Sequence, residues 1–275
     1  VKEGRWIIVG GWWIQPDCNI PSGESFVRQG LYGQRYFLER FGKTSVTGYN
    51  VDSFGHNGNL PQILKKSGLD NYVFMRPMPL EKGLPGRIFW WKSMDGSQVM
   101  TYRIPYEYCS WGKDLEKYAD RLKCELKDGE NDLMMFYGVG NHGGGPTKEN
   151  IRSIHALNER EDMPVMEMGT MERFFETVKV NGKEYPVYIG DLQHHASGCY
   201  SVLSRVKREN RRAEDELVRA EGWSAVAALV KGQPYPDNFK KAWKGVLFNQ
   251  FHDILAGTSI PSAYDDASYL YGQAM

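Results

Sequence analysis

Apolar residues recur along the first two thirds of the chain with two alternating periods, one typical of strands and the other of helices. Compact apolar runs predict strands at 5–13, 45–51, 72–78, 132–140, 164–169 and 185–192. Residues 87–104 predict a hairpin with Asp95-Gly96 at its turn. Apolar spacings of three and four residues predict helices at 22–42, 59–68, 113–127, 147–160 and 170–178. Because strands alternate with helices, we expect an α/β fold with a parallel sheet.

From about residue 200 the pattern becomes helical throughout. It predicts a long helix at 204–232, a second at 237–257 with Asp237 as its N-cap, and the start of a third at 259–275. No low-complexity linker precedes these helices. We therefore expect an α/β domain at 1–196 and a helical domain at 197–275 that packs directly against it.

Composition and charge exclude several classes of protein. The 34 basic and 34 acidic residues cancel, which argues against a general nucleic-acid binder. No apolar stretch approaches the roughly 18 residues that would cross a membrane. The four cysteines form no CxxC pair, so neither a zinc knuckle nor a disulfide framework is indicated. The N-terminus has no initiator Met and no signal-peptide pattern, and a cytoplasmic location is the expectation.

Polar side chains follow several predicted strands directly. Asp52 lies in "GYNVDSFGHNGNLPQIL" (48–64), Arg76 follows the next strand, and "GNHGGGP" (140–146) and "DLQHH" (191–195) follow two later ones. In parallel α/β folds the site lies at the carboxyl ends of the strands, so we expect all four at one rim.

Local pattern leaves the role of Asp52 open. It sits too early to cap the helix that begins near Asn59, but it fits either an Asx-turn or a working carboxylate over a pocket. His56 could pack within the loop, orient a carboxylate or bind a metal ion. In "FNQFHDILAGTS" (248–259), His252 is either a core histidine or a metal ligand.

The glycine-rich segment "YGVGNHGGGPT" (137–147) lacks the Lys of a phosphate-binding loop and only half matches a dinucleotide-binding GxGxxG. We interpret it as a loop whose backbone passes close to a ligand.

Six stretches together resemble the catalytic region of glycoside hydrolase family 38, the α-mannosidases, and most closely its bacterial branch. They are "GGWWIQPDCNIPSGESFVRQGLYGQRYF", "GYNVDSFGHNGNLPQIL", "NYVFMRPMP", "FYGVGNHGGGPTKENI", "LQHHASGCYS" and "NQFHDILAGTSI". The resemblance covers nearly the whole chain. It implies a seven-stranded β/α barrel at 1–196, incomplete because the first strand is missing, followed by a three-helix bundle at 197–275.

The resemblance also implies roles for individual residues. Asp52 would be the nucleophile of a retaining mechanism and a zinc ligand, and His252 a second zinc ligand. Arg76 would hold the Asp52 carboxylate, and an arginine in that position favours the ionised form of a carboxylate. The other substrate-binding positions implied are Trp12, Trp13, Phe54 and Asp253. Zinc would grip adjacent sugar hydroxyls, and the substrate would be an α-mannoside glycan.

Two departures from the family pattern affect these expectations. The His-x-Asp pair that supplies the other two zinc ligands does not occur in this chain. The general acid is expected in the glycine-rich loop, where Asn141 and His142 stand; an Asn cannot donate a proton as an acid, whereas a His can.

Two other functions stay open at this point. One is a carbohydrate-binding protein without catalysis, which the 13% aromatic content also suits. The other is a metal-dependent polysaccharide deacetylase, which also uses Asp and His at strand ends of a seven-stranded barrel. The sequence leaves the oligomeric state open.

Overall fold

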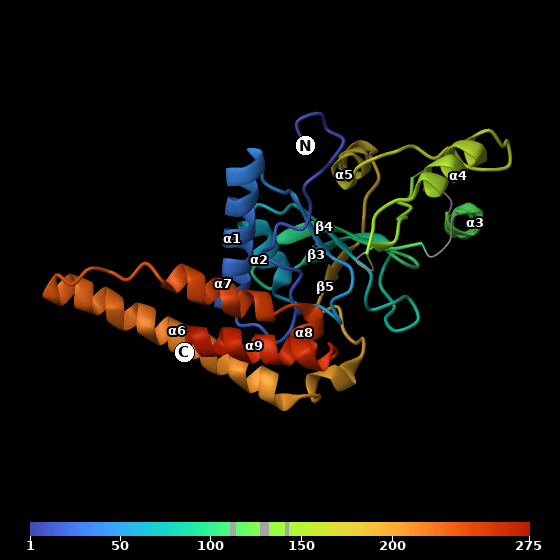
Figure 1. The fold of residues 1–275 in the computed structure, drawn as a ribbon. Coiled ribbons are helices and arrows are strands. Elements are labelled where there is room, and N and C mark those ends of the chain that lie inside the picture. The colour runs from blue at the N-terminus through green and yellow to red at the C-terminus, as the bar shows by residue number, and fades with distance from the viewer. Residues whose placement is uncertain (111–113, 127–131, 141–142) are drawn as a thin grey trace.

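The computed structural model describes residues 1–110, 114–126, 132–140 and 143–275. Over these residues the fold is α/β, with a mixed sheet near the centre and helices around it (Figure 1). The strands are β1 (Thr47–Asn50), β2 (Asn71–Phe74), β3 (Ile88–Lys92), β4 (Gln98–Arg103) and β5 (Val187–Ile189). The helices that precede or connect them are α1 (Gly23–Phe41), α2 (Leu60–Lys66), α3 (Glu116–Glu125), α4 (Lys148–Asn158) and α5 (Met171–Val180). Those that follow are α6 (Ser204–Lys231), α7 (Phe239–Asn249), α8 (His252–Ala256) and α9 (Pro261–Ala274).

The sheet order is β1-β2-β4-β3-β5. Strands β1, β2 and β4 are parallel, β3 is antiparallel to β4, and β5 is parallel to β3. The predicted α/β class and the predicted hairpin are confirmed. A wholly parallel sheet is wrong, because the turn at Asp95-Gly96 reverses the chain between β3 and β4. Among the described residues the sheet has five strands, so closure into a seven-stranded barrel stays a prediction.

Three predicted strands do not form. In segment 5–13 only Gly10 makes a bridge, to Gly48, and the positive φ values of Gly10 (96°) and Gly11 (71°) interrupt the extended backbone.

Segments 132–140 and 164–169 bond to side chains instead of to strand neighbours. The Tyr102 hydroxyl bonds both the amide and the carbonyl of Met134, each at 3.2 Å. The Asn158 side chain does the same for Met166, at 2.8 and 2.9 Å. An apolar run without a neighbouring strand has no ladder to join, and side-chain amides and hydroxyls then satisfy its backbone.

The helices follow the sequence pattern closely. Helix α1 begins after Ser22, whose hydroxyl accepts a hydrogen bond from the Ser25 amide, and ends at Gly42 in the left-handed conformation. The predicted helix at 237–257 is divided into α7 and α8. Asp237 is not its N-cap, because the helix begins one residue later, after Asn238.

The division between α7 and α8 has a structural cause. The Asp17 amide donates to the Gln250 carbonyl at 2.8 Å, and the His252 amide donates to the Gln15 carbonyl at 3.3 Å. This strand-like pairing between 15–17 and 250–252 takes backbone groups that a continuous helix would use internally.

Two apolar clusters meet at α1. Phe26 packs with the sheet core around Tyr72 and Trp91, and Tyr32 packs with the helical core around Trp243. The expectation that the helical part packs directly on the α/β part is confirmed.

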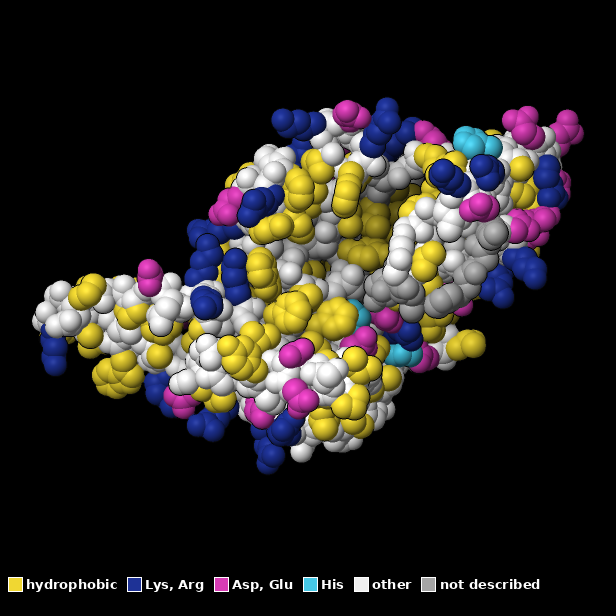
Figure 2. All heavy atoms as spheres, viewed as in Figure 1, with side chains coloured by type: hydrophobic (Ala, Val, Ile, Leu, Met, Phe, Trp, Pro, Cys, Tyr) yellow, Lys and Arg dark blue, Asp and Glu magenta, His cyan; other side chains and the backbone are white. Residues whose placement is uncertain are grey.

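The far half of α6 projects beyond the other helices (Figure 1) and carries exposed Trp223, Leu229 and Val230. Basic and acidic side chains are interspersed over the face seen in Figure 2, as expected from the net charge of zero. Within the described part of the chain, no helix combines the length and the apolar character needed to cross a membrane.

Candidate functional site

The register of β1 and β2 places Asp52 beside Arg76. Asn50 pairs with Phe74 at the ends of these parallel strands, and Asp52 and Arg76 each lie two residues farther on. Arg76 Nε donates to Asp52 Oδ1 at 2.6 Å. Both side chains are largely covered, with 27% of Arg76 and 19% of Asp52 exposed. The carboxylate therefore belongs to an ion pair at the strand ends and does not cap a helix.

Close packing fixes the loop that carries Asp52. Gly55 has a φ of 114°, and a Cβ added there would clash with the Gln193 side chain and lie 3.1 Å from the Leu192 carbonyl oxygen. The next residue, His56, exchanges two backbone hydrogen bonds with Leu192, at 2.9 and 2.8 Å. The loop is thus held against the segment that follows β5.

His56 supports Arg76 from within the core. Its side chain is fully buried; Nε2 lies 2.8 Å from the Arg76 carbonyl oxygen and Nδ1 lies 2.8 Å from the Tyr72 hydroxyl. Burial lowers the pKa of His56 to about 3, although the hydrogen bond to the Arg76 carbonyl opposes this. The ring is therefore neutral, donates from Nε2 and accepts at Nδ1. Of the roles left open, His56 takes the packing and positioning one.

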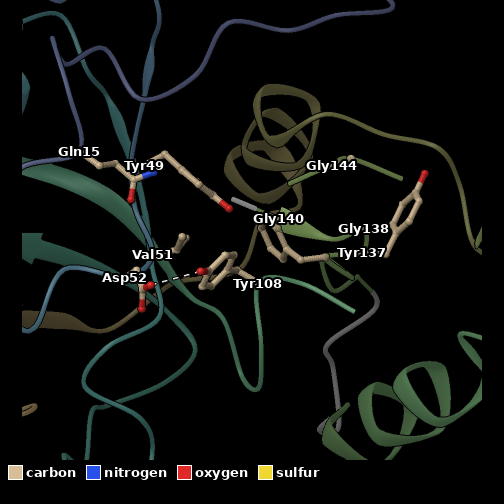
Figure 3. A pocket seen from close by; sticks show the side chains of 11 residues that line it. Gln15, Tyr49, Val51, Asp52, Tyr108, Tyr137, Gly138, Gly140 and Gly144 are labelled. Atoms are coloured by element: carbon tan, nitrogen blue, oxygen red, sulfur yellow. Dashed lines mark hydrogen bonds between the residues drawn. The ribbon is translucent and has the colours of Figure 1, made fainter. Parts of the chain in front are cut away.

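Asp52 faces a pocket of about 290 Å³. Its lining consists of aromatic, amide and glycine residues around the carboxylate: Gln15, Tyr49, Val51, Asp52, Tyr108, Phe136, Tyr137, Gly138, Gly140, Gly144 and Gly145. Figure 3 shows Tyr108 and Asp52 pointing toward one another, and the Tyr108 hydroxyl donates to Asp52 Oδ2 at 3.2 Å. Four glycines of the glycine-rich segment, Gly138, Gly140, Gly144 and Gly145, form part of the wall. That its backbone passes close to a ligand stays a prediction. An aromatic and amide lining around one carboxylate suits a polyol such as a sugar.

Tyr108 stays protonated in this setting. Burial, and then the negative charge of Asp52, raise the pKa of the Tyr108 hydroxyl well above its ordinary value. The hydroxyl therefore remains a donor to the carboxylate at any physiological pH.

His252 reaches the same carboxylate from α8. Its Nδ1 lies 3.0 Å from the Gln15 carbonyl oxygen, to which it can only donate. In the neutral ring this bond leaves a lone pair on Nε2. That nitrogen is buried, has no hydrogen-bond partner among the described residues and lies 4.0 Å from Asp52 Oδ2. A buried nitrogen lone pair beside a carboxylate oxygen is a donor set that fits zinc.

For a zinc ion these two residues would be only a partial ligand set. A structural or catalytic zinc ion takes about four donors. Within the described ranges, no group of three or more His, Cys, Asp and Glu side chains could hold a metal ion.

A second histidine contacts Arg76 on another N–H group. Arg76 Nη1 lies 2.7 Å from His195 Nε2, and His195 Nδ1 lies 2.6 Å from Glu81 Oε1. Phe54 packs beside this array, with ring-centroid distances of 5.7 Å to His195 and 6.3 Å to His252.

Of the predicted residues that the structure describes, Asp52 alone lines the pocket, and three others lie away from the cluster around it. Trp12 is 5% exposed, and its Nε1 donates to Asn50 Oδ1 at 2.6 Å within the sheet core. Trp13 packs edge-on against a tyrosine of α1, under Lys244 Nζ at 4.2 Å. Asp253 Oδ1 accepts from the Thr258 hydroxyl at 3.0 Å, next to the end of α8. Asp52, Arg76, Phe54 and His252 are the predicted residues that the fold brings together.

Asn141 and His142 lie outside the described residues. The sequence analysis missed Gln15, Tyr49, Tyr108, His195 and Glu81. The strand-end rule points to Tyr108, which follows β4 by five residues. The same rule is wrong for "DLQHH", because β5 runs antiparallel to β1 and β2; His195 reaches Arg76 because Leu192 pairs with His56. Gln15 and Glu81 carry no such local signal.

Two protein-family models together match nearly the whole chain. Residues 1–191 match the glycosyl hydrolases family 38 N-terminal domain, and residues 194–275 match the alpha mannosidase middle domain. Alpha-mannosidase G of Dictyostelium discoideum is 34% identical over 281 residues, covering 100% of this chain and 26% of that protein. An alpha-mannosidase of Saccharomyces cerevisiae is 33% identical, covering 96% of this chain and 26% of that protein. The chain thus spans about a quarter of the length of these relatives.

Among solved structures, an alpha-mannosidase from Enterococcus faecalis superimposes with a TM-score of 0.80 at 23% identity, covering 96% of this chain and 32% of that one. This likeness concerns the fold. The matches to both family models show that the chain belongs to glycoside hydrolase family 38.

Proposed function

We propose that this chain carries the nucleophile of a retaining α-mannosidase and that Asp52 is that nucleophile. One observation carries the proposal: Arg76 and Tyr108 each donate to a different oxygen of Asp52, at 2.6 and 3.2 Å, where the carboxylate faces the pocket. A carboxylate oriented by two donors at the mouth of a sugar-sized pocket is placed to attack an anomeric carbon. The printed names of the relatives, alpha-mannosidases, support a mannoside as substrate.

The proposed reaction has two displacements. An Asp52 oxygen forms a bond to the anomeric carbon while the bond to the leaving oxygen breaks, giving a glycosyl ester. Water then attacks the anomeric carbon and releases Asp52 with net retention. A second group must protonate the leaving oxygen and later accept a proton from water. We place that group in the glycine-rich segment, at Asn141 and His142, where only the histidine can donate a proton.

Zinc is the proposed cofactor, and Asp52 Oδ2 and His252 Nε2 are the donors this chain offers. When bound, zinc would supply a positive charge that grips neighbouring sugar hydroxyls. The Gln15 carbonyl has its own part, because accepting from Nδ1 holds the His252 ring with Nε2 toward Asp52. The Phe54 ring packs nearly perpendicular to the His252 ring, with the two centroids 6.3 Å apart.

The finer description of the fold is part of the same proposal. The strands at 1–196 would belong to a seven-stranded β/α barrel, and the helices at 197–275 to a three-helix bundle. The packing of α6, α7 and α9 around Trp243 and Tyr271 supports the second statement. A cytoplasmic location stays a prediction, as do the substrate-binding roles of Trp12, Trp13 and Asp253.

Trapping the glycosyl ester tests the proposal. The intact protein is incubated with zinc and a fluorinated α-mannosyl fluoride, which slows release of the ester, and is then digested for mass spectrometry. We expect the sugar on the peptide that contains Asp52. Asp52→Asn should remove the label and lower kcat at least about 10³-fold, whereas Asp120→Asn, at an exposed position of α3, should change neither.

Three results would contradict the proposal. A label on another carboxylate would move the nucleophile elsewhere. Binding of mannosides without turnover or label would favour a carbohydrate-binding protein. Release of acetate from acetylated polysaccharide without mannoside hydrolysis would favour a deacetylase.

A further inference from the structure

The guanidinium of Arg76 is held at two separate N–H groups. Nε donates to Asp52 Oδ1 at 2.6 Å, and Nη1 donates to His195 Nε2 at 2.7 Å. Arginine has five donors and no acceptor, so His195 must accept at Nε2. This fixes one tautomer of the imidazole, with its proton on Nδ1.

The other side of His195 is fixed by an acid. Nδ1 lies 2.6 Å from Glu81 Oε1 and donates to it. Glu81 Oε2 in turn accepts from the Met78 amide at 2.7 Å. Burial opposes ionisation of Glu81, but the hydrogen bonds from Met78 and His195 outweigh it and lower the pKa of the carboxyl group. The result is a chain of charge-assisted hydrogen bonds in which each member has one possible donor–acceptor role.

The four side chains come from different parts of the sequence and meet beside the carboxyl ends of β1 and β2, although β5 runs antiparallel to these two strands. The backbone pairing of Leu192 with His56 brings the segment after β5 to this end. Asp52 follows β1, Arg76 and Glu81 follow β2, and His195 follows β5. Their exposed fractions range from 17% for His195 to 33% for Glu81, so water has limited access to the array. Without His195, the long Arg76 side chain keeps its bond to Asp52 but loses the contact that fixes the plane of the guanidinium.

We propose that His195, oriented by Glu81, is a positioning residue for the nucleophile: it fixes the Arg76 guanidinium and thereby the direction of the Asp52 carboxylate. This inference rests on the proposed function of Asp52. His195 does not touch the reacting atoms. It acts on the attack of Asp52 on the anomeric carbon, so it affects kcat more than KM.

A pair of isosteric variants separates the two contacts of His195. In His195→Gln the side-chain amide reaches the position of Nε2, and its oxygen can accept from Arg76. In His195→Asn the shorter amide reaches only the position of Nδ1, so it can donate to Glu81 but cannot accept from Arg76. His194→Asn, at the exposed neighbouring position, is the matched control.

The expected result is a split between kcat and KM. With an aryl α-mannoside and zinc, His195→Asn should lower kcat about 10- to 100-fold, as for other groups that orient a reacting ligand. KM should stay within about twofold of the wild-type value, and His195→Gln should recover most of kcat. His194→Asn should resemble the wild type. Equal kcat values for His195→Asn and the wild type would overturn the inference, as would equal losses in the Asn and Gln variants.

Two further measurements keep the inference separate from the function on which it rests. Sugar trapped on Asp52 together with an unaffected His195→Asn variant would refute only the positioning role. Full mannoside turnover by Asp52→Asn would refute both. If the variants do not fold, ¹⁵N chemical shifts of labelled histidine in the wild type decide: an unprotonated Nε2 at His195 supports the inference, and a protonated Nε2 overturns it.

Discussion

Acid should destabilise this fold through one residue in particular, His56. The ring is fully buried between the Tyr72 hydroxyl and the Arg76 carbonyl, and its pKa is lowered to about 3 from an ordinary 6.5. The unfolded chain therefore binds a proton near pH 6.5, whereas the folded chain does not bind it until about pH 3. The stability that the neutral ring contributes is fully present above pH 6.5. It is lost progressively as the pH falls toward 3.

The magnitude follows from linkage. Each pH unit below 6.5 favours the unfolded state by up to 1.36 kcal/mol for this one group. Between about pH 7.5 and pH 5.0 the loss from His56 should be about 2 kcal/mol, with somewhat less than half of it present at about pH 6.0. This is a substantial fraction of the roughly 5–15 kcal/mol by which domains are stable.

Urea unfolding followed by tryptophan fluorescence at these three pH values measures the effect. His56→Gln removes the titrating group, and its amide N–H can still donate to the Arg76 carbonyl. The variant should start less stable but lose about 2 kcal/mol less than the wild type between pH 7.5 and pH 5.0. His155→Gln, at an exposed position of α4, should keep the pH dependence of the wild type. If wild type and His56→Gln lost equal free energy over this range, the account of a buried neutral His56 would be wrong.

Three other predictions use different parts of the site. Tyr108→Phe removes a hydrogen-bond donor to Asp52, the proposed nucleophile, and should lower kcat/KM about tenfold. Tyr106→Phe, whose hydroxyl bonds Glu125 outside the site, should leave kcat/KM unchanged. Equal kinetics of the Tyr108 variant and the wild type would exclude a role for the Tyr108 hydroxyl. Calorimetric titration of the intact protein with zinc should show one-to-one binding, and His252→Ala should weaken that binding at least about tenfold. An unchanged zinc affinity of the His252→Ala variant would mean that His252 is not a ligand. Gly55→Ala places a Cβ at a positive φ and in a clash, so it should lower the free energy of unfolding in urea by about 1–3 kcal/mol. Gly198→Ala has open space and should change that free energy little. Similar urea midpoints for the two variants would contradict the packing argument.

The sequence predicts best those features that depend on neighbours along the chain. Ser22 and Gly42 mark the ends of α1 because capping is local. The meeting of Asp52 and Arg76 was also predictable, since both follow parallel strands and the strand-end rule needs no knowledge of the loops.

Features that depend on distant partners were not predictable in this way. Segment 132–140 has the composition of a strand, but Tyr102 takes the backbone groups of Met134 that a neighbouring strand would need. From the sequence, Trp12 fits a sugar-facing position and a core position equally well. The structure decides for the core, because Asn50 accepts the indole N–H of Trp12. Aromatic residues have this ambiguity in general, because one face is apolar and one edge is polar.

His252 shows why the site belongs to the whole chain and not to the α/β part alone. The pattern of 248–259 is that of one helix, and in a continuous helix the His252 backbone would have bonded within it. The backbone of 15–17 instead pairs with 250–252, ends α7 and gives the imidazole a carbonyl acceptor at Gln15. That acceptor determines the tautomer, and the tautomer leaves the Nε2 lone pair 4.0 Å from Asp52. The His252 nitrogen thus reaches Asp52 only when the helical part is docked. Mutations that loosen this interface should therefore weaken the proposed zinc binding even where they touch neither residue.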